Sequence, residues 1–190
     1  MSWEEFLAWS DEDTLAEWID GEVIMTSPAS RRHQEVSLFL AQVIGLYVEQ
    51  RELGRLLVNP FAMKLELSGR EPDLLFVANA HLDRLKETSL EGPADLVIEI
   101  VSPESRARDR GSKFYEYEEA TIPEYWLIDP GRQSAEFYQL DAARRYRPAA
   151  PDAGGVYRSS ALPGFWLKVD WLWQEPLPKV LEVLREMELL

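Results

Sequence analysis

EPDLLFV at residues 71–77 and ADLVIEIVSPES at residues 94–105 are the two segments around which this chain is organised. Each contains a continuous apolar run, the pattern typical of a strand covered on both faces of a sheet. Asp73 stands where the first run begins, and Glu99 lies inside the second. A carboxylate among Leu, Ile and Val costs several kcal/mol unless it is paired or bound to a cation. The two acids therefore need a partner.

The composition is that of a globular protein with one hydrophobic core. The chain has 190 residues, of which 46% are hydrophobic, and it contains no cysteine for disulfides or thiolate zinc sites. No apolar run reaches the roughly 18 residues that a membrane span needs, and the acidic start is unlike a signal peptide. We therefore expect residues 1–190 to form a single cytoplasmic domain that does not cross a membrane.

The net charge of −14 argues against a ligand with many phosphates, because proteins that bind such ligands are usually basic. The local charge has the opposite sign in the segment from Glu104 to Lys113, which contains four cations and two anions. Acids that bind a divalent cation would also make the formal charge of a nuclease more negative. The composition alone therefore leaves nucleic acid open as a partner.

Apolar periodicity and turn residues predict the other elements. Helices are expected over residues 2–9, 30–52, 111–120 and 176–190, and strands over residues 56–59, 61–67, 73–78, 96–101, 125–128, 135–140, 157–160 and 165–173. Asp20-Gly21 predicts the turn of a hairpin over residues 17–25. Gly54 is expected to cap the long helix, residues 68–70 to turn the chain, and residues 79–94 and 141–155 to be connections. This order indicates an α/β or α+β fold, with a mixed central sheet flanked by helices.

The two acids can converge on one ion if their strands are neighbours. Magnesium binds oxygen ligands, acidifies a bound water and stabilises negative charge on a phosphate. The backbone carbonyl of Ile100 could supply a third oxygen, and Lys113 could orient water or neutralise charge. For either acid alone the simpler interpretation is structural, with Glu99 paired to an arginine and Asp73 capping a turn. The pair, followed by a lysine, favours a metal site.

Several segments in this order resemble the Uma family of restriction endonucleases, within the PD-(D/E)XK nuclease superfamily. The segments are EWIDGEVI (17–24), SPASRRHQ (27–34), EPDLLFV, DLVIEIVSPES, the Lys-x-x-x-Tyr of residues 113–117, and IPEYWLIDP (122–130). The resemblance implies a restriction-endonuclease-like core and a phosphodiesterase site that uses Mg²⁺ or Mn²⁺. It also implies a nucleic-acid substrate, with DNA expected, and a homodimer.

Carried over to this sequence, the resemblance makes Asp73 and Glu99 the metal-binding acids. The superfamily places a lysine two residues after the second acid, but Val101 stands there, so Lys113 would have to replace it. Glu17 and His33 match family positions that lie near the metal in related nucleases. A salt bridge within the hairpin explains Glu17 more simply, and a buried structural histidine explains His33 equally well.

Three arginines, Arg106, Arg108 and Arg110, could contact phosphates, although a solvated charged loop explains them equally well. Two alternatives to a nuclease stay open. A non-catalytic nucleic-acid-binding or regulatory module on a degenerate nuclease fold is suggested by the net charge and by Val101. A structural protein whose acids form an internal ion-pair network is the other.

Overall fold

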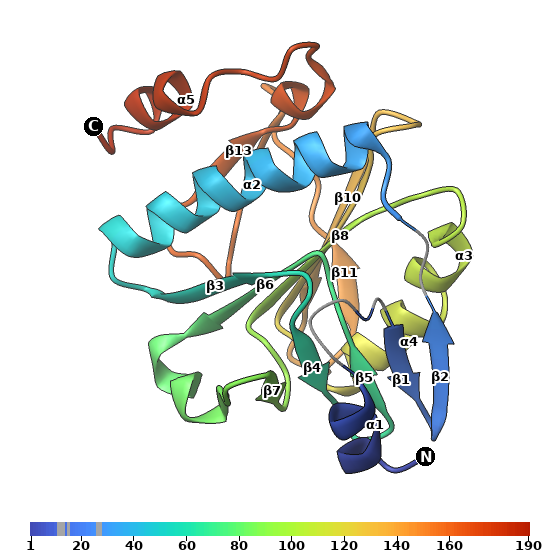
Figure 1. Ribbon diagram of the computed structural model, residues 1–190. Coiled ribbons are helices and arrows are strands. Elements are labelled where there is room, and N and C mark those ends of the chain that lie inside the picture. The colour runs from blue at the N-terminus through green and yellow to red at the C-terminus, as the bar shows by residue number, and fades with distance from the viewer. Residues whose placement is uncertain (11–13, 15, 26–27) are drawn as a thin grey trace.

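The computed structural model describes residues 1–10, 14, 16–25 and 28–190 and is shown in Figure 1. Its helices are α1 (Trp3–Trp9), α2 (Arg31–Gln50), α3 (Arg106–Asp109), α4 (Ser112–Glu119) and α5 (Val180–Glu186), with 3₁₀ turns η1 (Asn79–Arg84) and η2 (Val169–Trp173). The first seven strands are β1 (Ala16–Ile19), β2 (Glu22–Met25), β3 (Gly54–Val58), β4 (Ala62–Lys64), β5 (Ser68–Arg70), β6 (Leu74–Ala78) and β7 (Ser89–Glu91). The others are β8 (Leu96–Ile100), β9 (Glu124–Asp129), β10 (Ser134–Leu140), β11 (Tyr146–Pro148), β12 (Val156–Arg158) and β13 (Trp166–Lys168).

The central sheet has six strands in the order β11-β10-β9-β8-β6-β3. The β8 and β9 pair is parallel and the other pairs are antiparallel, so the predicted mixed sheet with flanking helices is confirmed. Alternate side chains of β6, β8 and β9 enter two separate cores. One core is covered by α2 and α5, and the other by α4 and the second sheet (Figure 1). Both faces of β8 are therefore buried, as its apolar run predicts.

A second sheet, in the order β2-β1-β5-β4-β7, carries the predicted hairpin. The capping box of Ser2 and Glu5 is present at the start of α1. Trp3 of this helix packs so closely on Gly69 that a Cβ at Gly69 would lie 2.1 Å from the indole ring. Residues 68–70 pair with β1 and β4 and form the strand β5, so the prediction of a turn there was wrong. This strand brings Arg70 next to the hairpin, where it meets Glu17.

Some element boundaries differ from the prediction. The strand expected over residues 61–67 is only β4, residues 79–94 contain η1 and β7, and the loop expected over 141–155 contains β11. Tyr146 in β11 is buried against Tyr125 and Phe114, an aromatic contact that local sequence does not indicate. The C-terminal helix begins at Val180, after the cis Glu175-Pro176 bond, and β13 continues into η2. No helix of the described residues is long and apolar enough to cross a membrane.

Gly54 is not the cap of the long helix. The helix ends at Arg51, Glu52 takes the positive φ of 51°, and Gly54 begins β3. A Cβ at Gly54 would lie 2.0 Å from the carbonyl oxygen of Val77 on the paired strand β6. The glycine is therefore required by the close approach of two strands.

We predict that Gly54→Ala destabilises the protein by about 1–3 kcal/mol, the range for backbone forced into strain. This loss corresponds to a fall in melting temperature of roughly 2–4 °C per kcal/mol for a chain of this size. Gly45→Ala is the matched control, because Gly45 lies inside α2 and its Cβ would meet only Leu56 at 3.7 Å. The control should stabilise the helix by up to about 1 kcal/mol. Equal melting temperatures for the two variants would contradict this packing argument.

Candidate active site

The ends of β6 and β8, the start of α2, the hairpin and α3 surround a cavity of about 720 Å³. Its lining contains all five predicted catalytic residues and Ile100, together with two of the three predicted arginines. The catalytic candidates are Glu17, His33, Asp73, Glu99 and Lys113, and the arginines are Arg106 and Arg108. Residues separated by up to 96 positions in sequence are thus gathered at one cleft.

Strand pairing explains why Asp73 and Glu99 come together. β6 and β8 are antiparallel with Leu74 opposite Ile98, so the next position along the pair sets Asp73 opposite Glu99. Residues directly opposite each other in such a pair lie about 4.5–5.5 Å apart at Cβ. Asp73 Oδ2 also accepts a hydrogen bond of 2.6 Å from the backbone N–H of Ile100. The first acid is therefore fixed to the strand that carries the second.

Helix α4 supplies two hydrogen-bond donors to Glu99. Its Oε1 accepts hydrogen bonds from Lys113 Nζ at 2.8 Å and from the Tyr117 hydroxyl at 2.9 Å. Lys113 and Tyr117 are four residues apart, so the helix presents both on one face. Glu99 and both donors are buried.

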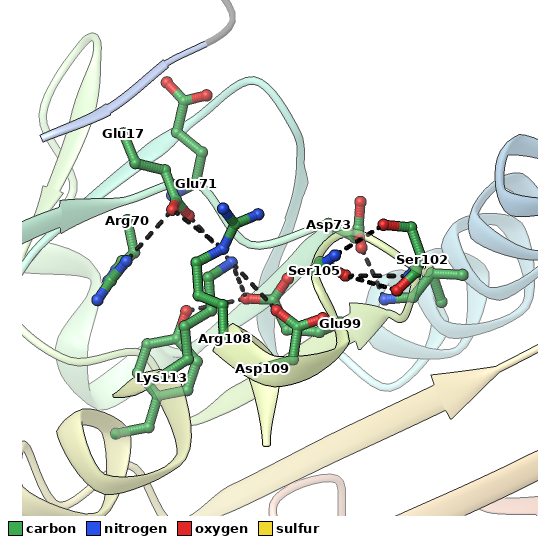
Figure 2. A network of polar contacts seen from close by, with 12 residues as sticks. Glu17, Arg70, Glu71, Asp73, Glu99, Ser102, Ser105, Arg108, Asp109 and Lys113 are labelled. Carbon is green, nitrogen blue, oxygen red and sulfur yellow. Dashed lines mark hydrogen bonds and ion pairs between the residues drawn. The ribbon is translucent and has the colours of Figure 1, made fainter. Parts of the chain in front are cut away.

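Lys113 is the central cation of the cluster, and Figure 2 shows it reaching toward the surrounding carboxylates. Its Nζ lies 2.8 Å from Glu99 Oε1, 2.9 Å from Glu17 Oε1 and 3.9 Å from Asp109 Oδ1. Burial lowers the pKa of Lys113, but the charges of the three carboxylates raise it by more than burial lowers it. The pKa of Lys113 is therefore well above its usual value. Lys113 is therefore an ammonium ion at neutral pH and cannot act as a general base.

Glu17 forms its ion pairs with residues outside its hairpin. Besides Lys113 it contacts Arg70 at 3.2 Å and Arg108 at 3.8 Å, and its pKa is lowered by these cations despite burial. The simpler interpretation, a salt bridge within the hairpin, does not describe these contacts. Glu17 instead ties the second sheet to α3 and α4.

His33 lies at the start of α2 and contacts Asp73, with Nε2 3.2 Å from Oδ1. Burial lowers the pKa of His33, but the hydrogen bond and charge of Asp73 and the backbone of Ile100 raise it overall. The other ring nitrogen, Nδ1, is buried without a hydrogen-bond partner among the described residues. His33 therefore contacts Asp73, a candidate metal ligand, and is not only a residue of the apolar core.

The three predicted phosphate-binding arginines are each paired with an acid. Arg110 points to β10 and does not line the cavity described above. The pairs are Arg106 with Asp129 at 3.2 Å, Arg108 with Glu17 at 3.8 Å, and Arg110 with Glu136 at 2.5 Å.

Three residues with strong effects on the cleft were missed from the sequence, namely Arg70, Glu71 and Asp109. Asp109 lies four residues before Lys113, but α3 ends at Asp109 and α4 begins at Ser112, so no single helix face would have linked the two side chains. Glu71 stands two residues before Asp73, but its burial follows from tertiary packing alone. Arg70 was hidden because the sequence around it reads as a turn.

The carboxylates of the cleft are not fully neutralised by its cations. Burial raises the pKa of Glu99 to about 8, with Asp109 and Asp73 adding to the rise and Lys113 opposing it. Burial, followed by the charge of Glu17, raises the pKa of Glu71 to about 7, and burial also raises the pKa of Asp109. Buried acids with raised pKa values that lie together in a cleft are typical of functional sites.

The donor set fits a hard divalent cation, because carboxylate and carbonyl oxygens are the ligands that Mg²⁺ and Mn²⁺ prefer. Asp73, Glu99 and the Ile100 carbonyl supply such oxygens. Within the ranges that the structure describes, no three acid or histidine side chains already surround one point at ligand distance. An ion bound here would therefore retain several waters, as Mg²⁺ usually does, or draw a further side chain toward it.

The raised pKa of Glu71 predicts a pH effect on stability. A carboxyl group that binds its proton more tightly when folded favours folding below its unfolded pKa, and loses that advantage as pH rises through the folded pKa. The advantage of wild type over Glu71→Gln should therefore decline between pH 4.5 and about 7. Melting temperatures of both proteins across this range, without metal, would measure it. A constant difference would show that Glu71 titrates normally.

Comparisons with known proteins identify relatives of this fold. A family model described as "Uma2: Putative restriction endonuclease" matches residues 3–170. A crystal structure described as "a putative nuclease belonging to DUF820", from Anabaena variabilis, aligns with a TM-score of 0.76 over 91% of this chain and 97% of that one. The sequence identity is 18%, so this likeness shows a shared fold. A search of curated proteins finds no match.

Proposed function

Because the chain belongs to the Uma2 family, as its motifs predict, we propose that it is a metal-dependent endonuclease that hydrolyses phosphodiester bonds in DNA. Membership in this restriction-endonuclease-like family implies a nucleic-acid substrate. The observation that carries the proposal is the placement of Asp73 opposite Glu99, with Lys113 hydrogen-bonded to Glu99. We also propose that the protein acts in the cytoplasm as a homodimer, and sedimentation equilibrium would test the dimer.

In this proposal Asp73, Glu99 and the Ile100 carbonyl hold Mg²⁺ or Mn²⁺. A bound ion of this kind lowers the pKa of water and stabilises negative charge on a phosphate. Lys113 and Tyr117 both donate to Oε1 of Glu99, which leaves Oε2 as the oxygen for the ion. Lys113, which stays protonated, neutralises charge that develops on the phosphate or orients the attacking water. His33 is a positioning residue that orients Asp73.

The acidity of the cleft bears on how a substrate enters it. A phosphate cannot approach Asp73, Glu99 and Asp109 without strong repulsion unless a cation lies between them. Arg106 and Arg108 line the cleft, and we propose that they contact phosphates on either side of the bond that is cut. Arg110, although it points to Glu136, belongs to the same basic segment and would act at its edge.

We predict that DNA binds in the presence of Ca²⁺ and binds at least about tenfold more weakly in EDTA, because the ion removes this repulsion. Fluorescence anisotropy with a labelled duplex at fixed ionic strength measures both affinities. Asp83→Asn, an exposed acid outside the cleft, is the control for general charge. Tight binding in EDTA would contradict the prediction.

A non-catalytic nucleic-acid-binding module is the second candidate function, favoured by Val101, which is buried where the superfamily has its lysine. Cleavage assays separate the two candidates. Plasmid DNA, single-stranded DNA and RNA are incubated with the protein in Mg²⁺ or Mn²⁺, with EDTA as control. Cleavage that requires the ion supports the nuclease, whereas metal-independent binding without cleavage supports the module.

A further inference from the structure

Asp109, the last residue of α3, is a buried carboxylate without a hydrogen bond. Its side chain is 1% exposed, and neither Oδ1 nor Oδ2 has a hydrogen-bond partner among the described residues. The nearest cation, Lys113, is 3.9 Å away and already binds Glu17 and Glu99 at shorter distances. The nearby Ser105 hydroxyl lowers the pKa of Asp109, but it forms no hydrogen bond of normal geometry to the carboxylate and instead contacts the Ser102 backbone. The carboxylate therefore lacks the partners that a buried charge requires.

A purely structural role does not account for this arrangement. The α3 segment is anchored through its backbone, because the Asp109 carbonyl accepts from the Tyr125 hydroxyl at 3.1 Å and its N–H donates to Ser105. The side chain adds no hydrogen bond to that anchorage. It lines the cleft beside Asp73 and Glu99 and raises the pKa of Glu99 by repulsion. The carboxylate therefore belongs to the lining of the cleft, and Asp109 anchors α3 through its backbone.

We propose that Asp109 is a third carboxylate ligand of the divalent cation, beside Asp73 and Glu99. The inference rests on the proposed metal dependence. The three carboxylates line the same cleft and come from the start of β6, from β8 and from α3 (Figure 2). No side-chain hydrogen bond of normal geometry holds either carboxylate oxygen, so both are available to a cation that enters the cleft. Coordination by Asp109 would complete a set that the metal-free arrangement leaves open.

The test is a titration of Mn²⁺ into the full chain by isothermal calorimetry, with melting temperatures measured in EDTA. Asp109→Asn should bind Mn²⁺ at least about tenfold more weakly, since even residues that only support metal ligands have effects of this size. In EDTA it should melt roughly 2–4 °C higher than wild type, because an uncompensated charge is gone. Glu104→Gln is the matched control, an exposed acid on the same cleft that should leave both values close to wild type.

Unchanged Mn²⁺ affinity in Asp109→Asn, with wild type binding normally, would overturn the assignment and leave the proposed function standing. A lower melting temperature in EDTA, or failure to fold, would also overturn it, because either result means that the carboxylate stabilises the metal-free protein. A wild type that binds no Mn²⁺ would remove the proposed function and this inference together. An equal loss of affinity in Glu104→Gln would reduce the effect to general charge.

Discussion

Asp73→Asn is expected to lower the rate of DNA cleavage by about a thousandfold while leaving the fold intact. A divalent cation contributes several kcal/mol to stabilising the transition state, and each 1.36 kcal/mol is a factor of ten in rate. The substitution removes one charged ligand from that ion. Asparagine retains an oxygen that can accept the hydrogen bond from the Ile100 N–H, so the junction of β6 and β8 should persist. Cleavage rates under single-turnover conditions, with melting temperatures in EDTA, measure the two effects separately.

Asp83→Asn serves as the control, because it removes the same charge from an exposed site outside the cleft. Its rate should match that of the wild type. Asp73→Asn cleaving as fast as the control would show that this carboxylate does not hold the catalytic ion. A large fall in melting temperature would instead assign Asp73 a mainly structural role.

Lys113→Met is expected to destabilise the protein by about 3–5 kcal/mol, the cost of leaving buried acids without their cation. Glu17 and Glu99 lie 2.9 and 2.8 Å from the lost ammonium nitrogen. The methionine side chain keeps most of the apolar part of the lysine side chain. The loss of stability should therefore reflect the lost charge more than any lost packing. Urea unfolding at neutral pH measures the change, and cleavage should be abolished in the same variant.

A double variant separates the effect of charge on the stability of Lys113→Met from other causes of its instability. Lys113→Met combined with Glu99→Gln should recover part of the lost stability, because it removes one of the acids that lost its partner. The recovery should increase as pH rises, because burial raises the pKa of Glu99 and the loss of Lys113, which opposes that rise, raises it further. Additive losses in the double variant would mean that Lys113 and Glu99 are not energetically coupled.

The features that depend on local sequence pattern were mostly predicted. Asp73 and Glu99 attract notice because acids in apolar strands need a partner, and the spacing of Lys113 and Tyr117 places both on one helix face. The predicted shared site depended on the two strands being neighbours, and the structure supplies their register, with Leu74 opposite Ile98. The predicted mixed sheet with flanking helices follows from the same periodicities.

Other features depend on contacts between distant segments, which no local pattern records. Gly69 reads as a turn residue, but it lies in a strand because it pairs with β1 and β4, and Trp3 packs directly on it. Gly54 reads as a helix cap, but the approach of Val77 explains it. The burial of Asp109 depends on how α3 packs on β9, through the hydrogen bond from Tyr125. The ion pairs of Arg70 likewise require β5, which was not expected.

Anomalous scattering from crystals soaked in Mn²⁺ is the most direct test of a shared ion at the cleft. The account predicts one strong peak in direct contact with both Asp73 and Glu99, absent from crystals of Asp73→Asn. Soaked wild-type crystals with no peak between these two carboxylates, from a protein that still cleaves DNA, would contradict it.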